Sequence, residues 1–253
     1  MRILSWEDFL RLEKKDNTAA MTIGVFDGLH AGHQRLIERV LEFSKSGGAQ
    51  PWLITFRENP KKILRPVSYL GDILPLRNKL EKLESFALHT AVIIDFSAGL
   101  SKLKGIDFMS LLRGHCMLNY LAIGEDFHFG WRMDTNAEKA REFLVPLGVK
   151  VEILPPVYHG GSRISSTRIR DFISGGDFRA AVSMLGYPYR IFFHGGGKNG
   201  GVARAALTQV IPKAGRYPVF FEGTAGGRNG FADVDADGIS WHYDGNVDAI
   251  TFV

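Results

Sequence analysis

The sequence predicts an α/β fold, with a parallel sheet covered by helices followed by a small antiparallel β domain. Apolar runs alternate with helical stretches up to about residue 186, which is typical of a parallel sheet wound with helices on both faces. Beyond Gly186 the helical periodicity ends, and short apolar runs alternate with glycine-containing turns. We therefore place one domain at residues 1–186 and a second at residues 187–253.

The first domain contains five predicted strands. The stretch 90–96 is β-branched and apolar throughout, as expected for a strand buried on both faces. The other predicted strands are 21–26, 51–56, 120–124 and 149–154. Helical periodicity lies between them, in the stretch that carries Leu36, Ile37, Val40 and Leu41 and in residues 76–88, 106–113 and 136–147.

The second domain reads as a set of hairpins. Its short apolar runs are 191–193, 217–221, 239–241 and 249–252, and its turn signals are Asn229-Gly230, Asp237-Gly238 and Asp244-Gly245. We interpret its phenylalanine-rich runs as sheet core rather than as a surface that stacks on a ligand. The glycine-rich stretch 194–201 is either a phosphate loop or a flexible turn, and its lack of Walker spacing favours the turn.

Composition limits the class of protein. The chain has 253 residues, 45% hydrophobic and 23% charged, with a net charge of +4, which suits an enzyme of anionic substrates as well as a weak nucleic-acid binder. Cys116 is the single cysteine, which excludes a disulfide framework and a cysteine-based metal site. The first eight residues lack a signal peptide's basic start, and no apolar run approaches 18 residues. We expect a cytoplasmic protein without nucleic-acid or membrane partners.

The stretch 21–33 carries the clearest functional signal. It predicts a buried strand, a sharp turn at Asp27-Gly28 and then a helix. His30 and His33 are three residues apart, so in helical geometry they share one face. The N–H groups and positive dipole end of a helix N-terminus attract phosphate, and two imidazoles beside them suggest nucleotide chemistry. The pair also fits an ordinary surface pair or half of a metal site.

A second phosphate site is suggested by residues 164–170. Ser165 or Ser166 is a plausible N-cap for the helix that follows. The segment is either a capped helix with surface arginines or a phosphate grip in which Arg168 supplies a charged fork. The polar segments 27–33, 57–60 and 125–132 all follow predicted strands, so we expect them to meet in one cleft at the carboxyl ends of the sheet.

Three motifs together resemble the bacterial FAD synthetase family, whose members are usually bifunctional riboflavin kinase/FMN adenylyltransferases. They are the segments 24–33, 124–130 and 164–170, and the resemblance covers about residues 18 to 190. It implies a Rossmann-like nucleotidyltransferase domain, ATP and FMN as substrates, FAD and pyrophosphate as products, and Mg²⁺ held mainly by the nucleotide phosphates.

The resemblance also implies roles for individual residues. His30, His33 and Arg168 would act on the transferred phosphate. The implied ATP-binding residues are Gly24, Phe26, Asp27, Gly28, Gly32, Ser165, Ser166 and Thr167. The implied flavin-binding residues are Phe56, Asn59, Pro60, Asp126, Phe127, Phe129 and Arg132. No residue is assigned as a metal ligand, and no oligomeric state is assigned.

The chain departs from the family pattern in three places. Asp126 stands where many members carry asparagine, and residues 56–60 replace the commoner Pro-His-Pro form. The kinase module of the family would show a Gly-Phe-Pro-Thr-Ala-Asn motif, but residues 201–210 read Gly-Val-Ala-Arg-Ala-Ala-Leu-Thr-Gln-Val. We infer that this module is a remnant without riboflavin kinase activity. The alternatives are a related nucleotidyltransferase with another phosphorylated acceptor and a non-catalytic flavin- or nucleotide-binding protein.

Overall fold

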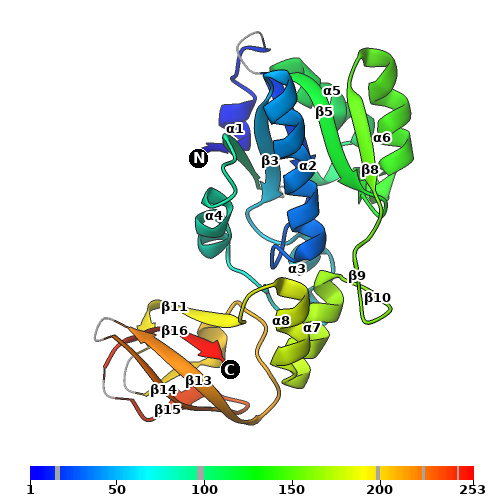
Figure 1. Ribbon diagram of the computed structural model, residues 1–253. Coiled ribbons are helices and arrows are strands. Elements are labelled where there is room, and N and C mark those ends of the chain that lie inside the picture. The colour runs from blue at the N-terminus through cyan, green and yellow to red at the C-terminus, as the bar shows by residue number, and fades with distance from the viewer. Residues whose placement is uncertain (15–17, 96–99, 198–199, 224–225, 244) are drawn as a thin grey trace. The chain divides into compact units, whose positions relative to one another are not determined.

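The computed structural model describes residues 1–14, 18–95, 100–197, 200–223, 226–243 and 245–253 (Figure 1). The chain forms two compact units. The first contains residues 1–26, 32–64 and 76–157, and the second contains residues 27–31, 65–75 and 158–253. The predicted division at residues 186 and 187 falls inside the second unit, and as a division of function it stays a prediction.

The first unit is built on a six-stranded sheet in which every neighbouring pair is parallel, which confirms the predicted fold class. The strand order is β1-β4-β3-β2-β5-β8. The strands are β1 (Arg2–Ser5), β2 (Thr18–Ile23), β3 (Gln50–Phe56), β4 (Thr90–Ile94), β5 (Met117–Gly124) and β8 (Lys150–Leu154). Strand β1 was not predicted, because it has only four residues and Leu4 is its single buried one.

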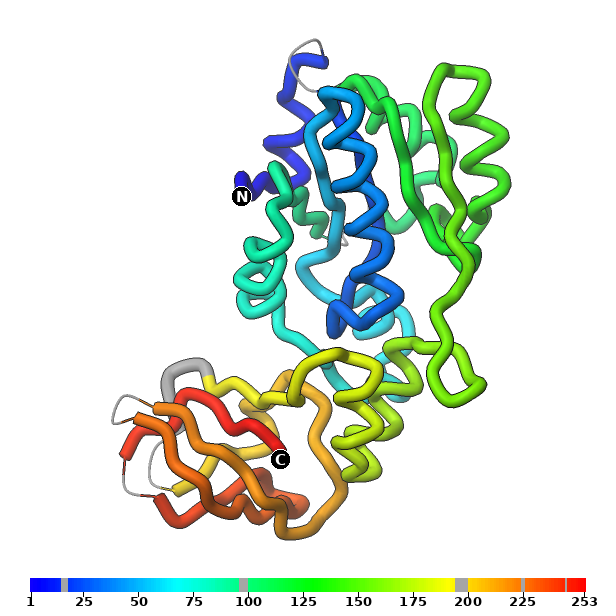
Figure 2. Tube along the Cα trace, in the orientation of Figure 1, coloured from blue at the N-terminus to red at the C-terminus, as the bar shows by residue number. Residues whose placement is uncertain are grey.

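The helices of the first unit lie between its strands, and the chain can be followed from β2 through α2 into β3 in Figure 2. They are α1 (Trp6–Phe9), α2 (Ala31–Gly47), α3 (Pro60–Leu64), α4 (Leu76–Glu84), α5 (Gly105–His115) and α6 (Ala137–Leu144). The short strands β6 (His128–Phe129) and β7 (Thr135–Asn136) pair with each other. Helix α4 ends before the predicted residue 88, and Ala87 beyond it is left-handed with φ of 56°.

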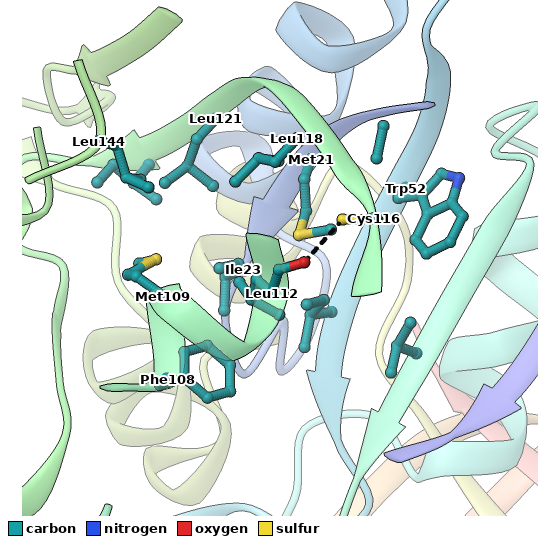
Figure 3. Packing of buried hydrophobic residues seen from close by; sticks show 14 of the residues in the cluster. Met21, Ile23, Trp52, Phe108, Met109, Leu112, Cys116, Leu118, Leu121 and Leu144 are labelled. Carbon is teal, nitrogen blue, oxygen red and sulfur yellow. Dashed lines mark hydrogen bonds between the residues drawn. The ribbon is translucent and has the colours of Figure 1, made fainter. Parts of the chain in front are cut away.

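The core of the first unit packs β2, β3 and β5 against α5 (Figure 3). Trp52 and Met109 are fully buried there. Cys116 lies in the same cluster and donates through Sγ to the carbonyl of Leu112 at 3.2 Å. Burial raises the pKa of this thiol to about 12, so Cys116 is protonated at neutral pH and serves packing rather than nucleophilic chemistry.

A network of polar side chains attaches helix α2 to strands β5 and β8 of the sheet. Arg39 donates to both carboxylate oxygens of Glu152, at 2.9 and 3.0 Å, and the Tyr120 hydroxyl donates to Glu152 at 2.6 Å. The Phe43 ring stacks on Tyr120 with centroids 4.3 Å apart. The hydrogen bonds from Arg39 are the main reason why the pKa of Glu152 lies below its usual value. This network fixes the helix that carries His33.

The second unit combines two helices, a hairpin and a six-stranded antiparallel sheet, which confirms the predicted small β fold. The hairpin is β9 (Tyr158–His159) with β10 (Ser162–Arg163), and the helices are α7 (Ser166–Gly175) and α8 (Phe178–Leu185). The sheet order is β11-β16-β13-β14-β15-β12. Its strands are β11 (Arg190–Gly197), β12 (Gly201–Ala203), β13 (Gly215–Gly223), β14 (Gly226–Val234), β15 (Gly238–Trp241) and β16 (Val247–Phe252).

Several aromatic side chains of the second unit are core residues, as predicted. Phe178 stacks on Phe252 with centroids 4.2 Å apart, and Phe193 stacks on Trp241 at 5.2 Å. Phe220 and Phe231 are exceptions, with 36% and 53% of their surface exposed. The apolar runs therefore fill the sheet core while leaving a few rings outside it.

One predicted turn is wrong. Asn229-Gly230 lies inside β14, where Gly230 pairs with Val219 of β13. A Cβ atom on Gly230 would lie 2.6 Å from the Phe221 ring, so this glycine makes room for a side chain instead of reversing the chain. The Asp237-Gly238 turn is confirmed, since both amides donate to Asp235 Oδ1. Residue 244 and the tip of the glycine-rich stretch, residues 198 and 199, lie outside the described residues.

The Arg39–Glu152 pair predicts a pH-dependent contribution to stability. A depressed carboxyl pKa stabilises the fold above the unfolded value, near 4.3 for glutamate, and this contribution is lost as pH falls through the folded value. We expect Glu152→Gln to lower the free energy of unfolding at pH 7, and we expect this difference from the original protein to shrink as the pH falls below about 4.3. Urea unfolding across this range measures the difference. The control Glu81→Gln removes an exposed pair with Arg77 and should change little at either pH.

Candidate active site

The first unit gathers polar and aromatic segments at one edge of its sheet. Strands β3, β2 and β5 are parallel neighbours, so their carboxyl ends lie at the same edge. Residues 24–26 follow β2, residues 57–60 follow β3, and residues 125–129 follow β5. All seven predicted flavin-binding residues belong to this unit. The edge where they gather is the usual location of ligands in parallel sheets.

The predicted flavin-binding residues have defined local surroundings. Asn59 is 8% exposed and its Oδ1 accepts from the Lys61 amide at 3.1 Å, at the start of α3. Phe127 and Phe129 contact each other with ring centroids 4.8 Å apart, and both pack on the core. Arg132 has φ of 56°. The roles of these residues toward a flavin stay predictions.

A buried ion pair organises the turn before α2. Asp27 is 4% exposed, and its Oδ1 accepts from the amides of Ile73 and Leu74 at 2.9 and 3.1 Å. Its other carboxylate oxygen accepts from the Arg170 guanidinium of α7. Arg170 is 5% exposed and also donates to the Gly71 carbonyl at 2.8 Å. Both buried charges are therefore paired and hydrogen-bonded, as burial requires.

The backbone of the same turn is held by two hydroxyl groups. Ser166, the first residue of α7, donates to the Asp27 carbonyl at 3.0 Å, and Tyr187 donates to the Gly28 carbonyl at 2.6 Å. Burial is the main cause that raises the pKa of Tyr187, so its hydroxyl keeps the proton that it donates. Gly28 has φ of 80°, and a Cβ there would lie 2.9 Å from Ile73. Only glycine fits this position without strain.

The two histidines lie at the start of α2. His30 is 6% exposed and immediately precedes the helix, which begins at Ala31. His33 is in the first turn, and its ring meets the Phe26 ring edge-on with centroids 5.2 Å apart. The first amides of a helix have no intrahelical acceptor and carry the positive end of its dipole. The location suits an anionic phosphate, and the shared face of the two imidazoles stays a prediction.

The start of α7 confirms one of the two predicted N-caps. Ser165 is the N-cap and accepts from the Arg168 amide at 3.3 Å, which decides between the two predicted caps. Arg168 donates to the carbonyls of His159 and Ser162 at 3.1 and 3.0 Å, and so holds the β9–β10 hairpin. Its role toward a triphosphate stays a prediction.

Arg170 is the residue that sequence reasoning missed. One of the two sequence-based alternatives for segment 164–170 placed its arginines on the surface, but Arg170 lies on the buried side of α7 with Ile169 and Ile173. Its place between these two apolar positions was the available signal. An arginine on the apolar face of a helix requires a buried acceptor, and Asp27 supplies it.

Neither a metal cluster nor a membrane helix is present in the part of the chain that the structure describes. No group of three or more His, Cys, Asp or Glu side chains there is arranged to hold a metal ion. Among the same residues, no helix has both the length and the apolar character needed to cross a bilayer.

Comparison with protein families decides the assignment. The family model described as FAD synthetase matches residues 12–168, which include the histidine motif and the start of α7. The chain belongs to the FAD synthetase family. The family match also covers the segment after β5, where Asp126 and Phe127 lie.

The match to this FAD synthetase family member spans a different share of each named relative. The chain is 27% identical over 209 residues to the FAD synthetase of Listeria monocytogenes, covering 81% of this chain and 82% of that protein. It is 29% identical to the bifunctional riboflavin kinase/FMN adenylyltransferase of Haemophilus influenzae, covering 79% and 68%. The bifunctional protein of Buchnera aphidicola from Schizaphis graminum is 29% identical, and the match spans 58% of its length.

A solved structure shares the fold of this FAD synthetase family member. A Streptococcus pneumoniae protein described as a macrolide-efflux protein has a TM-score of 0.78 and 22% identity, covering 100% of this chain and 90% of that one. This likeness supports the Rossmann-like architecture with its antiparallel β sheet.

The buried ion pair predicts a large stability effect. Arg170→Met leaves the Asp27 carboxylate buried without its cation, which costs about 3–5 kcal/mol. Urea unfolding measures this loss. The matched control Arg168→Met changes a half-buried arginine on the same helix and should cost about 1 kcal/mol. Adding Asp27→Asn to Arg170→Met should recover part of the loss, and strictly additive effects would contradict a direct pair.

Proposed function

We propose that this member of the FAD synthetase family is an FMN adenylyltransferase. It transfers AMP from ATP to FMN and yields FAD and pyrophosphate. The observation that carries this proposal is the network around Asp27, in which the turn before α2 receives Ser166 and Arg170 from α7. The two sequence motifs expected to hold ATP are thereby joined by hydrogen bonds within the second unit.

The reaction needs positioning more than proton transfer. An oxygen of the FMN phosphate attacks the α-phosphorus of ATP, and the bond to the β-phosphate oxygen breaks as pyrophosphate leaves with its electron pair. The FMN phosphate is already anionic near neutral pH, so no strong general base is required. Holding two reactants in line supplies about 7–11 kcal/mol in favourable cases. The remaining task is to stabilise charge on the transferred phosphate.

The start of α2 supplies the groups for this charge. The first amides of this helix point toward its N-terminal end, and His30 and His33 add hydrogen-bond donors at the same place. A preorganised donor is worth about 3–4 kcal/mol in the transition state. The hydroxyl of Thr167 and the first amides of α7 hold the triphosphate. Mg²⁺ accompanies the nucleotide phosphates and keeps several waters, and we assign it no protein ligand.

The flavin binds at the carboxyl ends of β3 and β5. The aromatic pair Phe127 and Phe129 follows β5, and Asn59 with Pro60 follows β3 at the start of α3. An apolar platform beside polar groups suits an isoalloxazine ring that carries a ribityl phosphate. We also propose a cytoplasmic location, with ATP and FMN as the small-molecule partners.

We further propose that the antiparallel sheet has no riboflavin kinase activity. The stretch 201–210, where the family's kinase motif is expected, contains the three-residue strand β12 followed by a 3₁₀ turn at residues 204–206. It has neither the threonine-asparagine pair nor the proline of that motif. The sheet keeps its aromatic core, so the loss concerns the nucleotide-binding residues and not the fold.

The histidines give a direct test of the adenylyl transfer. We expect His30→Ala and His33→Ala each to lower kcat at least about tenfold, because each removes a donor from the developing charge. FAD formation and pyrophosphate release with ATP, FMN and Mg²⁺ measure the effect. His242→Ala, at an exposed position of the second unit, should keep the original turnover. Unchanged turnover in both site variants would sink the assigned role.

The loss of kinase activity has its own test. Incubation of the protein with riboflavin, ATP and Mg²⁺ should produce no FMN, because the nucleotide-binding motif is missing. Chromatography with fluorescence detection measures the product, and FMN with ATP serves as the positive control in the same preparation. Formation of FMN at a rate comparable to adenylyl transfer contradicts this proposal and leaves the first one intact.

A further inference from the structure

A buried lysine lies beside the carboxyl ends of β2 and β3. Lys79, on helix α4, is 4% exposed. Its ammonium donates to the carbonyl of Val25 at 3.1 Å, to Thr55 Oγ1 at 2.9 Å and to the carbonyl of Phe56 at 3.1 Å. An ammonium group has three donors, so these acceptors match its full capacity.

The acceptors belong to two different segments of the site. Val25 lies between Gly24 and Phe26, which are assigned to ATP, and Phe56 ends β3, where the flavin segment begins. Thr55 is fully buried and donates to the Val25 carbonyl at 2.9 Å, which adds a direct link between the same two segments. Lys79 thus links the segment that follows β2 to the end of β3 by hydrogen bonds.

A buried lysine at this position costs free energy of solvation. Burial removes water from its charge, whereas a methionine of similar length would fill the same space without that loss. The other polar residues of α4 with described ion pairs are on its exposed side, where Arg77 pairs with Glu81. The lysine therefore has a specific task at this edge that an apolar side chain would not perform.

We propose that Lys79 is a positioning residue for the adenylyl transfer, acting through Val25 and Phe56. It fixes the spacing between residues 24–26 and the end of β3, and it places one fixed positive charge at the edge where two polyanionic substrates meet. This inference rests on the proposed function. Lys79 bonds to protein oxygens, so it shapes the binding of ATP and FMN without touching the reacting atoms.

The experiment compares Lys79→Met with the original protein. The variant keeps the length of the side chain and removes its charge and its donors. We expect KM to rise at least about fivefold for both ATP and FMN in protein that is folded by circular dichroism. Arg77→Met, which removes one positive charge from the exposed side of the same helix, should leave both KM values within about twofold.

The KM values separate positioning from stability. A variant that is merely less stable contains fewer active molecules, which lowers the apparent kcat and leaves both KM values unchanged. KM values within about twofold of the original for both substrates would therefore overturn the inference, whatever happens to kcat. If Lys79→Met does not fold, Lys79→Gln, which keeps two donors but no charge, is measured against the same two outcomes.

A second measurement keeps this inference distinct from the proposed function. The Kd for ATP with Mg²⁺ is measured by calorimetry for the original protein and for the variant. If the original protein binds ATP but makes no FAD, the proposed function fails, and a Kd at least about fivefold weaker in Lys79→Met still supports the positioning role. An unchanged Kd overturns it. If the original protein does not bind ATP, both proposals fall.

Discussion

The contact between Asp27 and Arg170 is the constraint on which the second unit depends. Neither charge is stable in the protein interior alone, and each is satisfied only when the other and the amides of Ile73 and Leu74 are in place. The pair therefore permits one arrangement of the turn, of the segment 71–74 and of α7. That arrangement fixes the path of the chain at the point where α2 begins.

Some residues of the two motifs, segments 24–33 and 164–170, have a structural role in holding this turn. Asp27 and Ser166 belong to the motifs expected to contact nucleotide, yet their described bonds go to the protein itself. Arg168 likewise donates to backbone carbonyls of the β9–β10 hairpin. A phosphate-binding turn needs amides that point outward, and such a turn keeps its shape only if other groups hold its carbonyls and its one carboxylate. The motifs therefore contain residues that hold this turn in place as well as the residues predicted to contact nucleotide.

The sequence predicts features of the structure that are decided by neighbouring residues, and it misses features that depend on residues distant in the chain. The parallel sheet and its helices follow from periodicity, and a serine cap at residue 165 or 166 follows from hydroxyls beside a helical stretch, because each is decided within a few residues. The role of Gly230 was not predictable, since the Phe221 ring that needs the space lies on another strand. Arg170 and Lys79 were missed for the same reason. Their acceptors are distant in sequence, and only the fold shows which oxygens these two cations reach.

The partners of the turn at Asp27 lie far along the chain, and this affects the order in which the protein folds during synthesis. The partners of this turn, Ser166, Arg170 and Tyr187, follow it by 139, 143 and 159 residues. A ribosome releases strands β1 to β5, which end by Gly124, well before it releases these side chains, and contacts so far apart form late. A nascent chain can thus assemble much of its first sheet while the turn at residues 27 and 28 is still unsupported. The turn at residues 27 and 28 gains these three contacts only after α7, α8 and Tyr187 have left the ribosome.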